Sequence, residues 1–155
     1  MRSGKVNKRV IQTDTIYKSR TVGRMINAIM QAGEKSVAQK IVYGAIEKLA
    51  EDKKEAVQAF EEAVRKVMPS QEVRSRRVGG ATYQVPTPVR HDRSEALAVR
   101  WIVDAARAKR GKAMMEKLFE ELKSAHDGTG SAIKKRDDTH KMADANRAFA
   151  HFGRF

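Results

Sequence analysis

The chain of 155 residues contains no cysteine, only three prolines and few aromatic residues, which make up 6% of the sequence. The absence of cysteine excludes disulfide bonds and thiolate metal sites, and it fits a reducing compartment. No run of about 18 apolar residues occurs, so the sequence predicts no membrane-spanning helix. Residues 1–9 are basic, but polar residues follow where the apolar part of a signal peptide would lie, so we expect a retained arm.

Acidic residues are scarce relative to basic ones. The chain has 32 Lys and Arg against 19 Asp and Glu, for a formal net charge of +13. Such an excess favours a polyanionic partner. The basic residues are not confined to one face of an amphipathic helix, so nucleic acid is a better candidate than a membrane surface. Positive charge gathers in residues 1–46 and 63–115, whereas residues 47–62 are net acidic and should face solvent or a basic neighbour.

Apolar residues at helical spacing predict a mainly α protein. The helices are expected around residues 22–30, 36–49, 55–67, 94–110, 113–126 and from 131 toward the C-terminus. Ser36, with a glutamine three residues later, and Ser94 have the chemistry of N-caps. Gly33 and Pro69 are placed to end helices. In the last helix, Met142 is among the residues expected to point inward.

Residues 73–86, VRSRRVGGATYQVP, predict a two-stranded β-ribbon. Two glycines between runs that favour strands are a strong signal for a hairpin with a two-residue loop. The opposed pairs would then be Arg74 with Val85, Arg76 with Tyr83, and Val78 with Ala81. Arginine falls on both faces and neither face is cleanly apolar, so we expect the ribbon to reach away from the body toward a negative partner.

Together these patterns predict a single domain of about six helices with an inserted two-stranded β-hairpin and a basic N-terminal arm. The arm would comprise residues 1–16, the hairpin residues 72–86, and the helical body residues 17–71 and 90–152. A chain of this length suffices for one buried core.

Catalytic and metal-binding patterns are missing. The four histidines do not form H-E-x-x-H, and acidic residues alternate with lysines along residues 116–123, as on a solvated helix face. The glycine-rich stretch 128–131 lacks the P-loop pattern and is typical of a connection between helices. An alternative is that the following helix receives a phosphate at its N-terminus, near Lys134, Lys135 and Arg136. We expect no enzyme activity, no metal and no cofactor.

Three basic clusters are the candidate contacts with nucleic acid, whereas an isolated residue such as Lys123 is typical of a solubilising surface. Tyr83 on the ribbon is available to stack on a base or ribose. Trp101 lies on the apolar stripe of its helix and is interpreted as core. The clusters are Lys5, Lys8 and Arg9 in the arm; Arg74, Arg76 and Arg77 in the ribbon; and Arg107, Lys109, Arg110 and Lys112 between the fourth and fifth helices.

Several blocks in the same order resemble the bacterial-type S-seven family of small-subunit ribosomal proteins. They are residues 73–86, residues 97–103 (LAVRWIV), residues 134–152 (KKRDDTHKMADANRAFAHF) and the first-helix pattern between Tyr17 and Gly33. The resemblance implies direct binding to the three-prime major domain of small-subunit ribosomal RNA and nucleation of head assembly. It also implies a position at the exit site near transfer RNA and messenger RNA, contacts with neighbouring ribosomal proteins, and location in a cytoplasmic or organellar ribosome.

The resemblance also implies roles for individual residues. Contacts with ribosomal RNA would come from Lys5, Lys8, Arg9, Lys18, Arg20, Arg24, Lys35, Arg74, Arg76, Arg77 and Arg93. The exit-site transfer RNA would be approached by Gly79, Gly80, Ala81, Thr82 and Arg147.

Three other classes of protein share some of these features. A helical DNA-binding regulator would have similar charge but would place a helix in the major groove. A nucleic-acid-processing enzyme would need metal ligands or a general base. A membrane-surface protein would bind anionic lipid as tightly as RNA.

Overall fold

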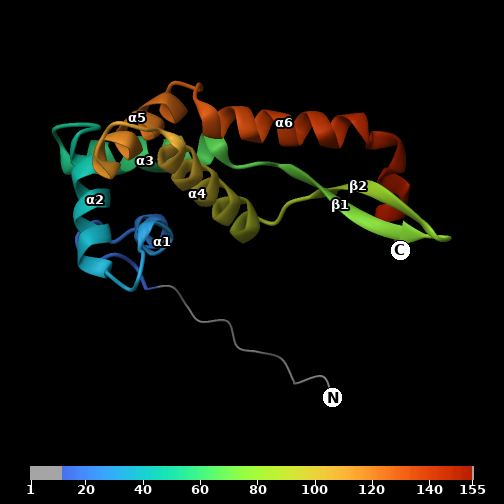
Figure 1. Ribbon diagram of the computed structural model, residues 1–155, viewed down its shortest axis with the longest axis horizontal. Helices are drawn as coiled ribbons and strands as arrows, with labels where there is room; N and C mark the ends of the chain where they lie inside the picture. Colours follow the sequence, from blue (N-terminus) through green and yellow to red (C-terminus); the bar gives the residue numbers. More distant parts are fainter. Residues whose placement is uncertain (1–11, 155) are drawn as a thin grey trace, which may run out of the picture.

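The computed structural model describes residues 12–154, so the predicted arm contacts Lys5, Lys8 and Arg9 lie outside the described residues. Figure 1 shows a helical body from which a β-ribbon and a long helix extend side by side. The elements are α1 (Arg20–Ile29), α2 (Lys35–Glu47), α3 (Lys53–Val67), β1 (Gln71–Val78), β2 (Ala81–Pro88), α4 (His91–Ala108), α5 (Met114–His126), α6 (Ser131–Ala145) and the 3-10 helix η1 (Arg147–Arg154).

The predicted mainly α fold with an inserted hairpin is confirmed. Helices α1 to α5 bury one apolar stripe each around a common core, as their helical periodicity requires. Trp101 packs against this core but stays half-buried. Within residues 12–154 no helix combines the length and apolar character needed to cross a bilayer. The largest fully buried apolar side chains are Phe60, Met25, Ile26, Ile46, Ile102, Leu118 and Leu122.

Two predicted N-caps are wrong. Helix α2 begins at Lys35, so Ser36 lies in its first turn, and α4 begins at His91, so Ser94 lies inside it. Ser94 is buried, and its Oγ donates a hydrogen bond of 2.7 Å to the carbonyl oxygen of Pro69, which ties α4 to the end of α3. A serine that satisfies a distant carbonyl has the same local sequence signal as one that caps a helix.

The ribbon has the predicted register. Cα partners run from Gln71 opposite Pro88 to Val78 opposite Ala81, with Arg76 opposite Tyr83. The ribbon extends away from the helical body as expected, but one side of it packs on protein, because η1 folds back from α6 onto β2 (Figure 1). Val85 is fully buried there.

The second half of α6 extends past the helical body and contacts the ribbon instead. The prediction that Met142 points inward is therefore wrong, since Met142 is 47% exposed. A helix with one end on the body and the other on the ribbon needs no single apolar stripe along its length.

Candidate nucleic-acid interface

The ribbon is held at its outer part by an aromatic cluster. The ring centroid of Tyr83 lies 5.3 Å from that of Phe149 and 4.9 Å from that of Phe152. The tyrosine ring is therefore already in contact with the protein, and the predicted stacking on a base or ribose would use the part of the ring that stays exposed. Both phenylalanines come from η1, far away in the sequence. Local pattern gives no sign of such a contact.

The base of the ribbon is organised by a buried acid that sequence reasoning did not single out. Glu72 Oε1 accepts hydrogen bonds from Arg74 Nε at 2.8 Å and Nη2 at 2.6 Å, and Glu72 Oε2 accepts from Arg93 Nη2 at 3.4 Å. The carboxylate is 11% exposed, whereas the arginine side chains are 60% and 51% exposed. Glu72 therefore fixes two guanidinium groups at the joint between β1 and α4 and leaves both accessible to a ligand.

Helices α1 and α4 are joined by a second ion-pair network. Arg24 is 12% exposed, and its Nη1 lies 2.7 Å from Glu95 Oε2, itself on a buried residue. Arg20 pairs with the exposed Asp92 at 3.2 Å. His91, Asp92 and Glu95 bring potential metal-ligand atoms within 4.8 Å of one another. The two arginines already neutralise these carboxylates, so the donor set does not favour a cation.

Three of the four predicted basic residues at the joint between α4 and α5 interact with the protein itself. Arg107 Nη2 donates to the carbonyl oxygens of Ala28 at 3.2 Å and Ile29 at 3.4 Å, at the end of α1, where such carbonyls lack helical partners. Lys109 Nζ lies 3.0 Å from Glu121 Oε2, and Lys112 pairs with Glu120. That hydrogen bond is the main cause that raises the pKa of Lys112 and lowers the pKa of Glu120.

Glu121 also occupies the start of α6. It is 1% exposed, and its Oε1 accepts a hydrogen bond of 2.9 Å from the backbone N–H of Ala132. A phosphate at this amide would meet the carboxylate, so this N–H is not available to the nucleic acid. The sequence contains a signal that Glu121 is buried, because it stands next to Leu122 on the apolar side of α5 that faces the core. Lys134 and Lys135 stay exposed, and Arg136 donates to the carbonyl oxygen of Lys66 and pairs with Asp137 at 2.6 Å.

The segment that leads into α1 is fixed by Asp14. Its Oδ2 accepts hydrogen bonds from the backbone N–H groups of Ile16 at 3.1 Å and Tyr17 at 3.0 Å, and its Oδ1 accepts from Tyr43 Oη at 2.6 Å. Burial and then this hydrogen bond raise the pKa of Tyr43 to about 12. Asp14 thus attaches the segment before α1 to α2. The sequence signal for this role is the aspartate itself, because Asp side chains accept hydrogen bonds from nearby backbone N–H groups in Asx-turns.

Comparison with known proteins identifies the family. A model of the family described as ribosomal protein S7p/S5e matches residues 1–147. The chain is 56% identical to the small ribosomal subunit protein uS7 of Fervidobacterium nodosum, over 98% of this chain and 99% of the relative. It is 53% identical to the protein of the same name from Pelagibacter ubique, over 94% of each chain. The chain belongs to the ribosomal protein S7 family.

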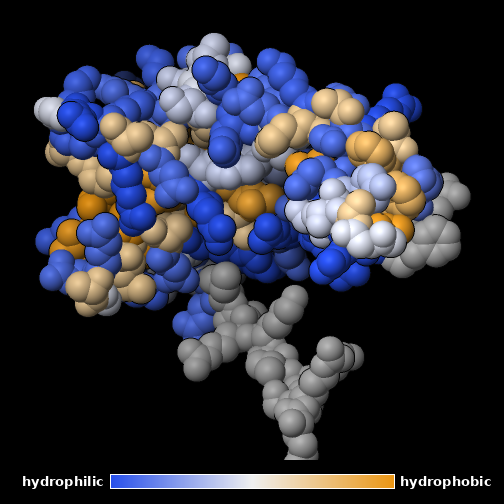
Figure 2. Space-filling model, turned by 45° about the vertical axis from the view of Figure 1, so that its right-hand side comes forward, coloured by the Kyte–Doolittle hydropathy of each residue, from blue (hydrophilic) through white to orange (hydrophobic). Residues whose placement is uncertain are grey.

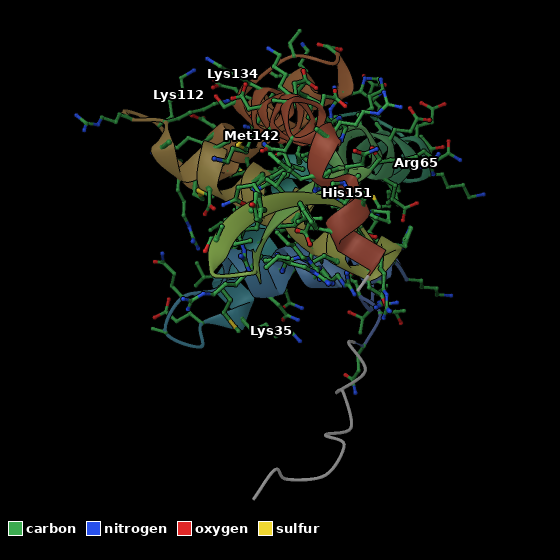
Figure 3. All side chains as sticks on the ribbon, turned by 90° about the vertical axis from the view of Figure 1, so that its right-hand side faces the viewer. Lys35, Arg65, Lys112, Lys134, Met142 and His151 are labelled. Carbon is green, nitrogen blue, oxygen red and sulfur yellow. The ribbon has the colours of Figure 1, made fainter. Side chains whose placement is uncertain are left out.

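The resemblance seen in the sequence is therefore confirmed, and S7-family membership makes this protein a structural component of the small ribosomal subunit rather than an enzyme. Its predicted contact residues do not form one surface. In Figure 3, Lys35 lies on the opposite side of the molecule from Lys112 and Lys134. On the face drawn in Figure 2, hydrophilic side chains surround separate apolar patches.

The predicted cations of this S7-family protein divide by their partners. Arg76 has an interaction within the protein. Acids or carbonyls hold Arg20, Arg24, Arg74, Arg93, Arg107, Lys109, Lys112 and Arg136. Among residues 12–154 no hydrogen bond or ion pair engages the side chains of Lys18, Lys35, Arg77, Arg110, Lys134, Lys135 and Arg147, all of which are exposed.

Proposed function

We propose that this protein binds the three-prime major domain of small-subunit ribosomal RNA directly, and that it nucleates assembly of the subunit head together with neighbouring ribosomal proteins. The observation that supports the proposal most is the ribbon with its base. Glu72 presents Arg74 and Arg93 half-exposed, and Arg77 on the same ribbon is exposed and has no partner among the described residues. Fixed guanidinium groups suit bidentate contacts with phosphates.

The physical role of such contacts is to neutralise charge where RNA helices meet. Phosphates of adjoining RNA helices repel one another, and cations that displace their counterions stabilise the junction. Cations on several sides of the protein would let it hold more than one RNA segment at once.

The tip of the ribbon is proposed to lie beside the exit-site transfer RNA and the messenger RNA. Residues 79–82 are exposed and small, and Gly79 and Gly80 have φ of +57° and +89°, a backbone conformation that favours glycine. A tip without bulky side chains lets its backbone approach another surface closely. Arg147 in η1 is exposed. It lies near the ribbon, since it lines a groove together with Pro86 and Pro88 of β2.

The experiment measures binding to a fragment of the three-prime major domain over a range of salt concentrations. The double variant Arg76→Ala and Arg77→Ala should bind more weakly, and the slope of log affinity against log salt should become shallower by about 1 for each phosphate that the variant no longer neutralises. Lys123→Ala, an exposed cation on α5, is the matched control and should leave the slope unchanged. A slope in the double variant equal to that of the parent protein would contradict the ribbon's role.

A competition at fixed salt separates RNA from DNA as the partner. A structured RNA fragment should displace labelled RNA at much lower concentration than duplex DNA of equal length does. Equal competition by duplex DNA would favour the alternative of a helical DNA-binding regulator.

A further inference from the structure

The groove between α1 and α4 has a composition that the proposed phosphate contacts do not explain. It has a volume of about 540 Å³, within the range of about 300–1,000 Å³ typical of small-molecule sites. Its α4 side is a stripe at helical spacing that includes Ala96, Val99, Val103 and Arg107. The lining surface is mostly apolar, so phosphate alone is a poor match for it.

Four charged residues line the groove: Arg24, Arg100, Asp104 and Arg107. Arg24 and Arg107 are tied to neighbouring elements, the first to Glu95 and the second to the carbonyl end of α1. Arg100 on α4 also lines the groove, is exposed, and has no partner among the described residues. An apolar floor beneath an uncommitted guanidinium group suits a flat aromatic ligand that carries negative charge.

We propose that this groove holds one unstacked nucleotide of the bound RNA. The base lies against the apolar lining at Ala28 and Ala96 and stacks against the guanidinium group of Arg100, and the adjoining phosphates face the exposed Arg107. Unpaired bases that leave the helical stack are recognised on apolar surfaces and arginine planes, whereas A-form duplex offers no such base. This inference rests on the proposed function, because it names the kind of RNA element that binds.

The length of the groove fits one nucleotide with its flanking phosphates. Ala96 and Arg107 are eleven positions apart on α4, which corresponds to about 16 Å along the helix. Asn27 and Asp104, one on each wall, are exposed and line the groove. An amide and a carboxylate provide a donor and acceptors for the Watson–Crick edge of the base. The groove therefore carries groups for base recognition as well as for charge.

Crosslinking tests the site directly, because the chain has no cysteine and a single introduced one can be labelled uniquely. Ala96→Cys carries a photoactivated aryl azide at the exposed edge of the groove. In complex with the three-prime major domain fragment, irradiation should crosslink it to one or two adjacent unpaired nucleotides, mapped by primer extension. Lys123→Cys with the same label is the control and should not crosslink to these nucleotides.

Affinity measurements then test the stacking. Arg100→Ala, and separately removal of the base at the crosslinked nucleotide, should each weaken binding roughly tenfold, as expected for one stacked base. Combining the two changes should weaken binding little further, because both remove the same interaction. Arg65→Ala removes an exposed arginine on α3 that does not line the groove (Figure 3) and should not show this coupling.

Failure of the proposed function and failure of the inference about the groove give different results. If the parent protein forms no complex with the fragment, the proposed function itself is wrong. If a complex forms but the label crosslinks to duplex RNA, to no RNA, or in assembled subunits to another protein, the inference about the groove is overturned. Fully additive effects of Arg100→Ala and the abasic RNA would also overturn it.

Discussion

Removal of the carboxylate of Glu121 should destabilise the fold far more than its position on a charged helix suggests. The side chain is 1% exposed, and one hydrogen bond and one ion pair join α5 to the start of α6 and to the end of α4. Its Oε1 accepts from Ala132 N–H at 2.9 Å, and its Oε2 lies 3.0 Å from Lys109 Nζ. Glu121→Ala therefore leaves a helix-end amide without its acceptor and an ammonium group without its main counter-ion.

The magnitude follows from the burial of each partner. Breaking a buried ion pair by removing one member costs about 3–5 kcal/mol. Lys109 is 30% exposed and can be partly rehydrated, so we expect a destabilisation of about 3 kcal/mol for Glu121→Ala, near the lower end of that range. Glu121→Gln keeps an acceptor for Ala132 N–H and should be destabilised by only about 1–2 kcal/mol.

Urea unfolding followed by far-ultraviolet circular dichroism measures both variants. The control is Glu116→Ala, which removes an exposed carboxylate from the same helix and should change the free energy of unfolding by about 0.5 kcal/mol or less. The reasoning is refuted if Glu121→Ala is no more destabilising than this control. The same network predicts that Lys109→Met leaves the salt slope of RNA binding unchanged, because its ammonium group is held by Glu121.

Two further predictions concern other contacts. Phe152→Ala should destabilise the ribbon by about 1–2 kcal/mol, since it removes an aromatic partner of Tyr83 from a half-buried site. Amide hydrogen exchange should become faster in β1 and β2 but not in α3. Exchange rates in β1 and β2 equal to those of the parent protein would contradict this. Tyr43→Phe should cost about 1–2 kcal/mol, because Asp14 loses a hydrogen bond of 2.6 Å, and thermal unfolding at neutral pH measures it; an unchanged midpoint would show that water replaces the hydroxyl.

The sequence predicts the elements of this fold well, because their causes are local. Apolar residues at a spacing of three and four specify helices wherever they pack. The glycines at 79 and 80 set the hairpin loop, and with it the whole register of the ribbon. The ends of helices are less predictable, since the hydroxyl of Ser94 makes a tertiary hydrogen bond with Pro69 instead of a cap.

The candidate interface was predictable only in outline. Composition locates the cations, but their partners depend on which acids the fold brings to them. Glu72 holds Arg93 across a separation of 21 residues, and Glu95 holds Arg24 from another helix. Likewise the partners of Tyr83 lie in η1, so no local pattern could show that its ring is already packed.

The division of the cations by partner gives the net charge a more specific meaning. Arginines held by buried carboxylates, such as Arg24, position helices, so their removal should appear mainly as reduced stability. Exposed cations that have no partner within residues 12–154, such as Arg77, Arg100 and Arg110, contribute little to the fold, so their removal should appear mainly in the salt dependence of RNA binding. Arg74 and Arg93 combine both properties, because Glu72 fixes them while half of each side chain stays exposed. The base of the ribbon is therefore where folding of the protein and binding of RNA should be most strongly coupled.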